Sequence, residues 1–206
     1  MARSSRSKAE VRQVKNTILD AAARVFGRRG FQVITMADLA AEAGYSTASI
    51  YNYFPDKDAL LVGLVDRSIE QFMEAAQTEF PGSVLPAARL EWLALRLLQV
   101  AHDNLGLMTM LLSHGMASQG GGSANVVERY FSVHQHFMDA ITPHISATST
   151  LGDEVAAQLG YQFVGILRTE SFTWLMGTPP TSLEPIAARL TRFFLGGVAA
   201  LGGDAQ

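Results

Sequence analysis

The sequence contains no cysteine, which excludes disulfides, thiolate metal sites and cysteine nucleophiles. Long apolar runs are also missing. The longest stretch without a charged residue, 104–127, includes Ser, His, Gln and three consecutive glycines, and this composition excludes a membrane-spanning helix. The basic start has neither the apolar segment nor the cleavage site of a secretory signal. Together these absences predict a soluble, cytoplasmic protein that does not contact membranes.

Positive charge is scarce overall but is concentrated at one end of the chain. The net charge is -3, yet residues 1–57 hold nine Lys/Arg against five Asp/Glu, a balance of +4. The remaining residues hold seven against fourteen, a balance of -7. A basic end on an acidic body is typical of a phosphate-binding module joined to a second domain that does not bind DNA.

The stretch 35–54 predicts two short helices joined by a tight turn. Thr35 and Asp38 form a helix start signal, and Gly44 favours the left-handed conformation found at helix ends. Ser46 can cap a second helix that continues to Phe54, since Pro55 prevents further extension. This pattern is typical of a helix-turn-helix, in which the second helix enters the DNA major groove.

Of the whole sequence, 48% of the residues are hydrophobic, and the rest of the chain shows helical periodicity. The glycine-rich stretch 118–123 is interpreted as a flexible loop. Capping patterns at Thr150/Asp153 and Thr181/Glu184 predict the starts of the last two helices. The expected fold is all-α with about nine helices, and the further helices are expected over residues 8–29, 56–78, 85–103, 105–117, 124–145 and 153–176 and from 184 onward.

The residues around the helix-turn-helix sharpen this interpretation. The run 18–61 resembles the DNA-binding domain of the TetR family of transcriptional regulators, with small departures at Met36, Tyr45 and Tyr53. The matching residues are Ile18, Leu19, Ala21, Ala22, Phe26, Gly30, Phe31, Thr35, Leu39, Ala40, Ala43, Gly44, Ser46, Ser49, Ile50, Tyr51, Phe54, Lys57, Leu60 and Leu61. The resemblance implies a three-helix DNA-binding domain, 1–55 with its basic arm, and a helical ligand-binding and dimerisation domain, 56–206.

Side chains near the start of a recognition helix reach base edges, and hydroxyls and amides also bind phosphates. Asn52 has the groups to bond adenine, and Tyr53 is as suited to packing on the first helix as to contacting DNA. The family implies phosphate contacts from Tyr51, Lys57 and the helix start at Thr35. The full set of expected DNA-binding residues is Thr35, Ser46, Thr47, Ala48, Ser49, Tyr51, Asn52, Tyr53 and Lys57.

A single small helix-turn-helix buries little surface, so a homodimer on an inverted-repeat operator of double-stranded DNA is expected. The family points to the last two helices as the interface, although these helices could instead simply cover the core of one chain. The expected interface residues are Gly160, Phe163, Val164, Leu167, Trp174, Leu190, Phe193 and Gly197.

The family also implies a pocket for a small-molecule effector among the central helices. Candidate lining residues are mostly Met and aromatic, with His134 as a polar contact, and ordinary core packing is the alternative for each. They are Trp92, Met108, Met110, Leu111, Met116, Phe131, His134, Phe137 and Met138.

The predicted function is a transcriptional regulator, most often a repressor in this family, released from a palindromic operator by a largely apolar effector. An activator remains an alternative. So does a metal-responsive regulator that uses His102, His114, His134, His136 or His144, although His134 and His136 face different ways on a helix. No enzyme motif occurs in the sequence, and no metal or cofactor is expected.

Overall fold

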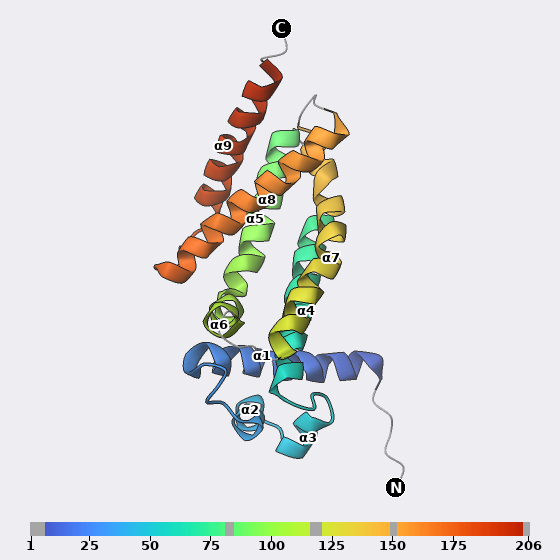
Figure 1. Cartoon of the computed structure of the whole chain (residues 1–206), viewed down its shortest axis with the longest axis vertical. Coiled ribbons are helices and arrows are strands. Elements are labelled where there is room, and N and C mark those ends of the chain that lie inside the picture. Colours follow the sequence, from blue (N-terminus) through green and yellow to red (C-terminus); the bar gives the residue numbers. More distant parts are fainter. Residues whose placement is uncertain (1–6, 81–84, 116–120, 149–151, 204–206) are drawn as a thin grey trace. The chain divides into compact units, whose positions relative to one another are not determined.

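The computed structural model describes residues 7–80, 85–115, 121–148 and 152–203. Within these ranges the chain forms nine α-helices and no strand, which confirms the all-α expectation (Figure 1). None of these helices is long and apolar enough to cross a membrane in the part of the chain that is described.

Four helices make up the first part of the chain, and local signals set their ends. A capping box at Ser7 starts α1 (Lys8–Arg29), and a second at Thr35 starts α2 (Met36–Ala43). Gly44 ends α2 in the left-handed conformation, at φ 72°. Ser46 caps α3 (Thr47–Tyr51), and α4 spans Lys57–Gln77.

The recognition helix α3 ends earlier than the sequence predicts. The amides of both Tyr53 and Phe54 donate to the carbonyl of Ile50, at 2.9 and 3.0 Å, so the chain tightens after Tyr51. This turn directs Phe54 into the core, where it is almost fully buried. The expected helical extension to Phe54 is therefore replaced by a turn that serves tertiary packing.

The remaining helices are α5 (Pro86–Asp103), α6 (Leu105–Gly115), α7 (Gly121–Ser146), α8 (Asp153–Met176) and α9 (Glu184–Gly203). Helix α7 begins at Gly121, so the second half of the expected 118–123 loop is helical, while 118–120 lie outside the described residues. Gly152 precedes α8 without a side-chain cap, and the expected cap at Thr150 lies outside the described residues. At the start of α9 the hydroxyl of Ser182, next to the expected Thr181, donates to Glu184 at 2.8 Å.

The chain folds into two compact units. Unit 1 comprises residues 1–67 and 106–127, and unit 2 comprises 68–105 and 128–206, so the divisions fall within α4, at the start of α6 and within α7. The domain boundary expected between residues 55 and 56 remains a prediction.

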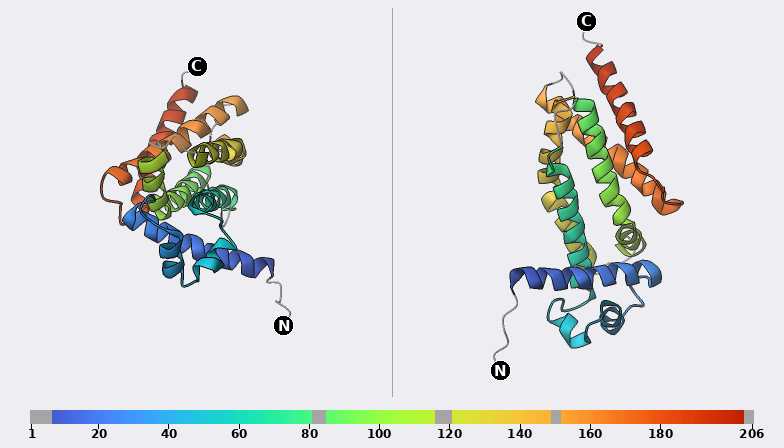
Figure 2. Two further views of the ribbon diagram at one scale, coloured as in Figure 1. Left: turned by 60° about the horizontal axis from the view of Figure 1, so that its bottom comes forward. Right: turned by 180° about the vertical axis from the view of Figure 1, so that it is seen from behind.

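In unit 1, α1 packs against α2, and α2 packs against α3. Figures 1 and 2 show α2 and α3 on the same side of α1. The buried stripe of α1, which includes Ile18, Leu19 and Phe26, forms the core of this unit with Leu39 and Ile50. These contacts form the three-helix arrangement that the resemblance implies.

In unit 2, α5 contacts both α8 and α9. Five of its residues are buried, in keeping with a central helix that is apolar on several sides (Figure 2). Around it lies a continuous apolar core that includes Ile141, Phe163, Trp174 and Phe194.

Candidate nucleic-acid interface

Helix α3 has one buried side and one open side. Ile50 is completely buried, and Phe54 is nearly so, as expected for core residues. Ala48, Tyr51 and Asn52 are exposed, whereas Thr47, Ser49 and Tyr53 are half-buried. The side chains of Thr47, Tyr51 and Asn52 make no hydrogen bond within the described part of the chain. The open side of α3 is therefore available to a ligand.

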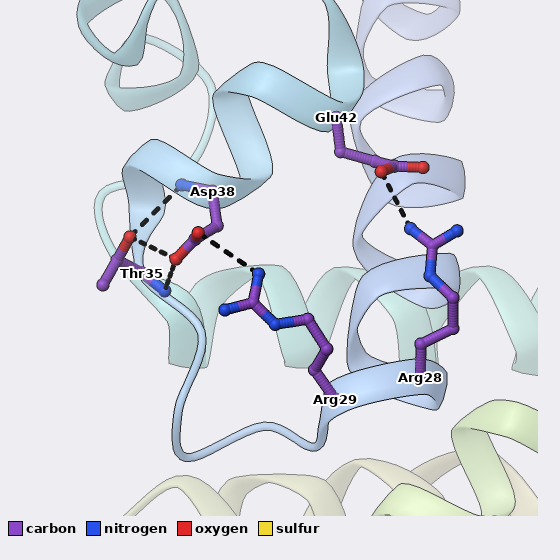
Figure 3. Close-up of polar contacts among 5 residues, drawn as sticks. All are labelled: Arg28, Arg29, Thr35, Asp38 and Glu42. Carbon is purple, nitrogen blue, oxygen red and sulfur yellow. Dashed lines mark hydrogen bonds and ion pairs between the residues drawn. The ribbon is translucent and has the colours of Figure 1, made fainter.

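Three of the predicted contact hydroxyls have a structural role in capping. The Thr35 hydroxyl donates to the carboxylate of Asp38 at 2.6 Å and accepts from the Asp38 amide at 3.2 Å (Figure 3). The Ser46 oxygen accepts from the Ser49 amide at 3.1 Å, and the two serine hydroxyls lie 2.8 Å apart. Because its proton is held by Asp38, Thr35 can bind a phosphate only after that bond is broken.

The amides at the start of α2 are the more available donors. In a helix the first N–H groups have no partner within the helix, and the helix dipole makes that end positive. Within the capping box, the Thr35 amide donates to the Asp38 carboxylate and the Asp38 amide donates to the Thr35 hydroxyl. The amides of Met36 and Ala37 are left for an external acceptor. An anion at this helix start is a recurrent arrangement in proteins.

Residues from three helices and the loops between them meet around one open hollow of about 470 Å³. It is lined by residues of the α1–α2 loop, α2, α3 and the start of α4, including Thr35, Met36, Tyr51 and Lys57. Asp56 and Asp58 also line it. The carboxylate of Asp56, which directly precedes α4, accepts from the Ala59 amide in the first turn of that helix at 2.7 Å. The three residues for which the family implies phosphate contacts thus lie at one site.

Lys57 is held in place by the loop that it faces. Its Nζ donates to the carbonyls of Phe31 and Gln32, at 3.0 and 3.2 Å, and lies 4.9 Å from the centre of the Phe31 ring. An ammonium has three donors, so one remains after these two bonds are made. Lys57 therefore fixes the loop that borders the hollow and still presents its charge there.

An ionic network, which the sequence reasoning missed, joins α1 to α2. Arg24 and Arg28 bind the two oxygens of Glu42, at 3.0 and 2.8 Å, and Arg29 binds Asp38 at 3.3 Å (Figure 3 draws the Arg28 and Arg29 bonds). The Arg24 bond, with Arg28, holds the pKa of Glu42 below its usual value. The pKa of Asp38 is lowered chiefly by the Thr35 hydroxyl and amide.

This network orients α2 relative to α1, and hence α3. The signal for it is present in the sequence as two pairs at i, i+4 spacing, Arg24/Arg28 on one helix and Asp38/Glu42 on the next. Each pair places both charges on one face of its helix, and the two faces carry opposite charge.

The expected effector residues are spread over both units. In unit 2, Met138 is buried, Trp92 and Phe137 are half-buried, and the ring of His134 lies 5.6 Å from that of Tyr161. In unit 1, Met108 is exposed and Leu111 is half-buried. The side chains of Met110, Met116 and Phe131 lie outside the described residues. An effector-binding role for this set remains a prediction.

Most of the expected dimer residues lie inside unit 2 instead of on its surface. Phe163, Leu167, Trp174 and Leu190 belong to the core, and Phe163 stacks edge-on against Phe194 with ring centres 5.1 Å apart. Gly160 is also buried, where a Cβ would lie 3.3 Å from the Cε of Met138, so it allows α7 to approach α8. Val164 is half-buried, and only Phe193 and Gly197 are exposed.

A different set of apolar residues is exposed on these two helices. On α8 they include Tyr161, Phe172 and Met176, which share one helix face by their spacing. On α9, Phe193, Gly197 and Leu201 recur every fourth residue. Periodicity revealed the buried stripe of α8 but not this second one.

No group of three or more potential metal ligands occurs among the described residues. Of the histidines, His114 has a side chain outside the described residues, and His144 is partly buried with its Nε2 3.2 Å from the Ala76 carbonyl. The metal-responsive alternative gains no support from this arrangement.

A capped helix pair, an exposed recognition helix and a flanking hollow lined by Lys57 are the features of a helix-turn-helix of the kind that binds DNA. Residues 18–64 match the model of the bacterial regulatory proteins of the tetR family. This part of the chain is similar in sequence to the DNA-binding domain of that family.

Similar proteins show how far the likeness extends. Nucleoid occlusion factor SlmA of Pasteurella multocida is 30% identical over 111 residues, which cover 54% of this chain and 55% of that protein. A TetR-family regulator of Mesorhizobium loti shares the fold with a TM-score of 0.67 at 16% identity, over 95% of this chain and 98% of that one. Regulator FadR of Bacillus subtilis, solved with stearoyl-CoA, has a TM-score of 0.67 at 15% identity, over 89% and 98%.

The chain covers only about a third to a half of the length of the curated relatives that it matches. The match spans 35%, 55% and 45% of the length of three curated relatives. The likeness to the solved structures, which extends over nearly the whole chain, is a likeness of fold.

Proposed function

We propose that this chain is a sequence-specific DNA-binding transcriptional regulator. The observation that carries the proposal is the meeting of Thr35, Tyr51 and Lys57 around one hollow beside the open side of α3. A phosphate in this hollow would be bound by the Lys57 ammonium, the Tyr51 hydroxyl and the free amides of α2. These contacts would fix the register of α3 in the major groove.

Base reading would then fall to the exposed residues of α3. Asn52 has the donor and acceptor needed for two bonds to adenine, and Ala48 permits a close approach or contact with a thymine methyl. The open side of the five-residue helix presents few side chains, so one copy would read only a short site. Sequence specificity therefore requires two copies.

A homodimer through α8 and α9 is the second element of the proposal. The exposed apolar residues of these helices include Met176, 81% exposed, and Phe193, 72% exposed. Apolar side chains of this size are stabilised when a partner covers them, and a two-fold axis would present the same face on both copies. An inverted-repeat operator follows from that symmetry.

The dimer is tested by mass in solution. Phe193→Asp is expected to give a monomer at micromolar concentration, because it places a charge in the contact. Leu85→Asp provides the control, since Leu85 is also 76% exposed but lies at the start of α5, and this variant should stay dimeric. A monomeric wild-type protein would contradict the proposed dimer.

The third element is release by a small, largely apolar effector, with repression as the resting function. Apolar residues dominate the interior of unit 2, and a neighbour of the same fold was solved with stearoyl-CoA. Both tryptophans, Trp92 and Trp174, lie in this unit, so their fluorescence would report binding there. A compound that raises the melting temperature and also releases DNA would identify the effector. Failure of a broad panel of apolar acids and thioesters on both counts would contradict this element.

The first experiment is selection of bound duplexes from a random DNA pool at near-physiological salt. Enrichment of an inverted repeat is the expected result, and its half-site spacing gives the separation of the two α3 helices. Transcription of a template that carries the selected site then separates repressor from activator. Salt-sensitive binding without any enriched sequence would contradict specific regulation, because phosphate contacts alone carry no sequence information.

A further inference from the structure

The basic residues of unit 1 fall into two groups. Among the described residues of 7–67, four arginines are neutralised by carboxylates: Arg24 and Arg28 by Glu42, Arg29 by Asp38 and Arg67 by Asp20. Four other basic residues have no carboxylate within 4 Å in the part of the chain that is described: Lys8, Arg12, Lys15 and Lys57. Lys57 belongs to the hollow, so three unneutralised cations remain, all on α1.

These three cations share one face of α1. Lys8, Arg12 and Lys15 are spaced at i, i+4 and i+7, which places them one above another along the helix. The next position on that face is Leu19, which is buried in the core of unit 1. The face of α1 that is buried from Leu19 onward thus carries the three cations in the first half of the helix, where the core does not cover it.

The side chain at that edge is Phe54, which directly follows the recognition segment. The Nζ of Lys15 lies 5.7 Å from the centre of the Phe54 ring. Leu19 and Phe54 both approach Gly63, where a Cβ would lie 3.2 and 3.0 Å from them. The cationic face thus begins at Phe54, and α1 continues past α3 toward its N-terminus (Figures 1 and 2).

We propose that Lys8, Arg12 and Lys15 form a second phosphate-binding ridge, which contacts the backbone of the same duplex whose bases α3 reads. The proposal rests on the proposed DNA-binding function and adds a site that is separate from the hollow. Three like charges at helical spacing repel one another, and Lys8 lies in the first turn, at the positive end of the helix. An external polyanion relieves both effects; the acidic residue of the first turn, Glu10, is engaged with the Ser7 amide at 2.6 Å.

The dimensions of the ridge suit a DNA backbone. Seven residues of helix separate Lys8 from Lys15, which is about 10 Å at 1.5 Å per residue. One DNA strand carries a phosphate roughly every 3.4 Å along the axis, so the ridge spans about three successive phosphates. The Phe54 ring supports the stem of Lys15, which reduces the freedom that its ammonium loses on binding.

The test is the salt dependence of binding, measured by anisotropy of a labelled duplex between 50 and 200 mM KCl. Each lost phosphate contact lowers the slope of log K against log salt by about 0.9. Lys15→Gln should lower it by about that amount, so that its affinity falls about 3.5-fold less than that of the wild type over this range. The Lys8/Arg12/Lys15→Gln triple variant should lower the slope by roughly two to three. Lys15→Arg should retain the wild-type slope.

Two controls separate charge from packing. Arg89→Gln removes one exposed charge from α5 in unit 2 and should leave the slope unchanged. The melting temperature of Lys15→Gln should match that of the wild type, because Lys15 is exposed. A Lys15→Gln variant that binds more weakly with an unchanged slope would overturn the proposal, since Lys15 would then act only through Phe54. A triple variant with the wild-type slope would overturn it as well.

The slope can be measured on any duplex, because phosphate contacts do not depend on sequence. If the wild type enriches an inverted repeat but the variants keep its slope, the ridge fails and the proposed function stands. If the wild type enriches nothing, yet the slope falls in the variants, the ridge stands and specific regulation fails.

Discussion

Gly63 provides a stability test of the core that holds the recognition helix. It lies inside α4, where replacement by alanine normally stabilises a helix by up to about 1 kcal/mol. At this position, however, the new Cβ would lie 3.0 Å from Cε1 of Phe54 and 3.2 Å from Cδ2 of Leu19. Both side chains are almost fully buried and have little room to move. Overpacking of this kind costs about 1–3 kcal/mol.

We therefore expect Gly63→Ala to be neutral or to lower the free energy of unfolding by up to about 2 kcal/mol. Gly27→Ala is the matched control, because a Cβ there would meet only the Cα of Gly106, at the ordinary distance of 3.9 Å. The two variants should differ by about 1–3 kcal/mol, or about 2–4 °C in melting temperature for each kcal/mol.

The assay is thermal and urea unfolding followed by circular dichroism. Gly63→Ala should also weaken DNA binding, since a displaced Phe54 carries the α3–α4 turn with it. A Gly63→Ala protein as stable as Gly27→Ala would refute the reasoning, because Phe54 and Leu19 would then have to yield without cost.

Three further predictions concern charged groups. Lys57→Ala should weaken binding to all DNA sequences alike and lower the slope of log K against log salt by about one. It should also reduce the melting temperature, because the α1–α2 loop loses its bonds at Phe31 and Gln32. An unchanged salt dependence would show that Lys57 does not contact a phosphate. The pKa values of Asp38 and Glu42 are lowered, so these carboxylates stabilise the folded protein above about pH 4, and this stabilisation is lost as the pH falls. Glu42→Gln should therefore be less stable than the wild type at pH 7, and the difference should vanish by about pH 2. Burial lowers the pKa of His144, so as the pH falls this histidine is protonated in the unfolded chain before it is protonated in the folded protein. The wild type should therefore lose stability below about pH 6.5, and the stability of His144→Gln should depend less on pH between pH 7 and 5.

Helix ends were predictable wherever a local signal sets them. Thr35, Gly44 and Ser46 start or end α2 and α3 as expected, because the capping atoms lie within a few residues of the backbone groups that they satisfy. The end of α3 was not predictable in this way. There the turn after Tyr51 depends on Phe54 reaching a core built from α1 and α4, which no local pattern encodes.

The same reasoning separates the two parts of the binding surface. The family motif places Thr35, Tyr51 and Lys57 in the sequence, but only the fold shows that they line one hollow. The ionic network beside it was encoded in i, i+4 charge spacing, yet that spacing names no partner until two helices are known to be adjacent. Charge position alone likewise could not distinguish the neutralised Arg24 from the unneutralised Lys15.

Helix α8 shows most clearly where periodicity stops being informative. An apolar stripe at helical spacing requires a cover, but it does not say whether the cover belongs to the same chain or to a second copy. The residues expected to contact a partner, such as Phe163 and Leu167, are covered by the chain itself. Tyr161, Phe172 and Met176 form another stripe, which polar residues interrupt and which the chain leaves exposed. A dimer surface should therefore be sought among the apolar residues that remain exposed after the core of one chain is complete, and on this helix those are the residues that the stronger pattern concealed.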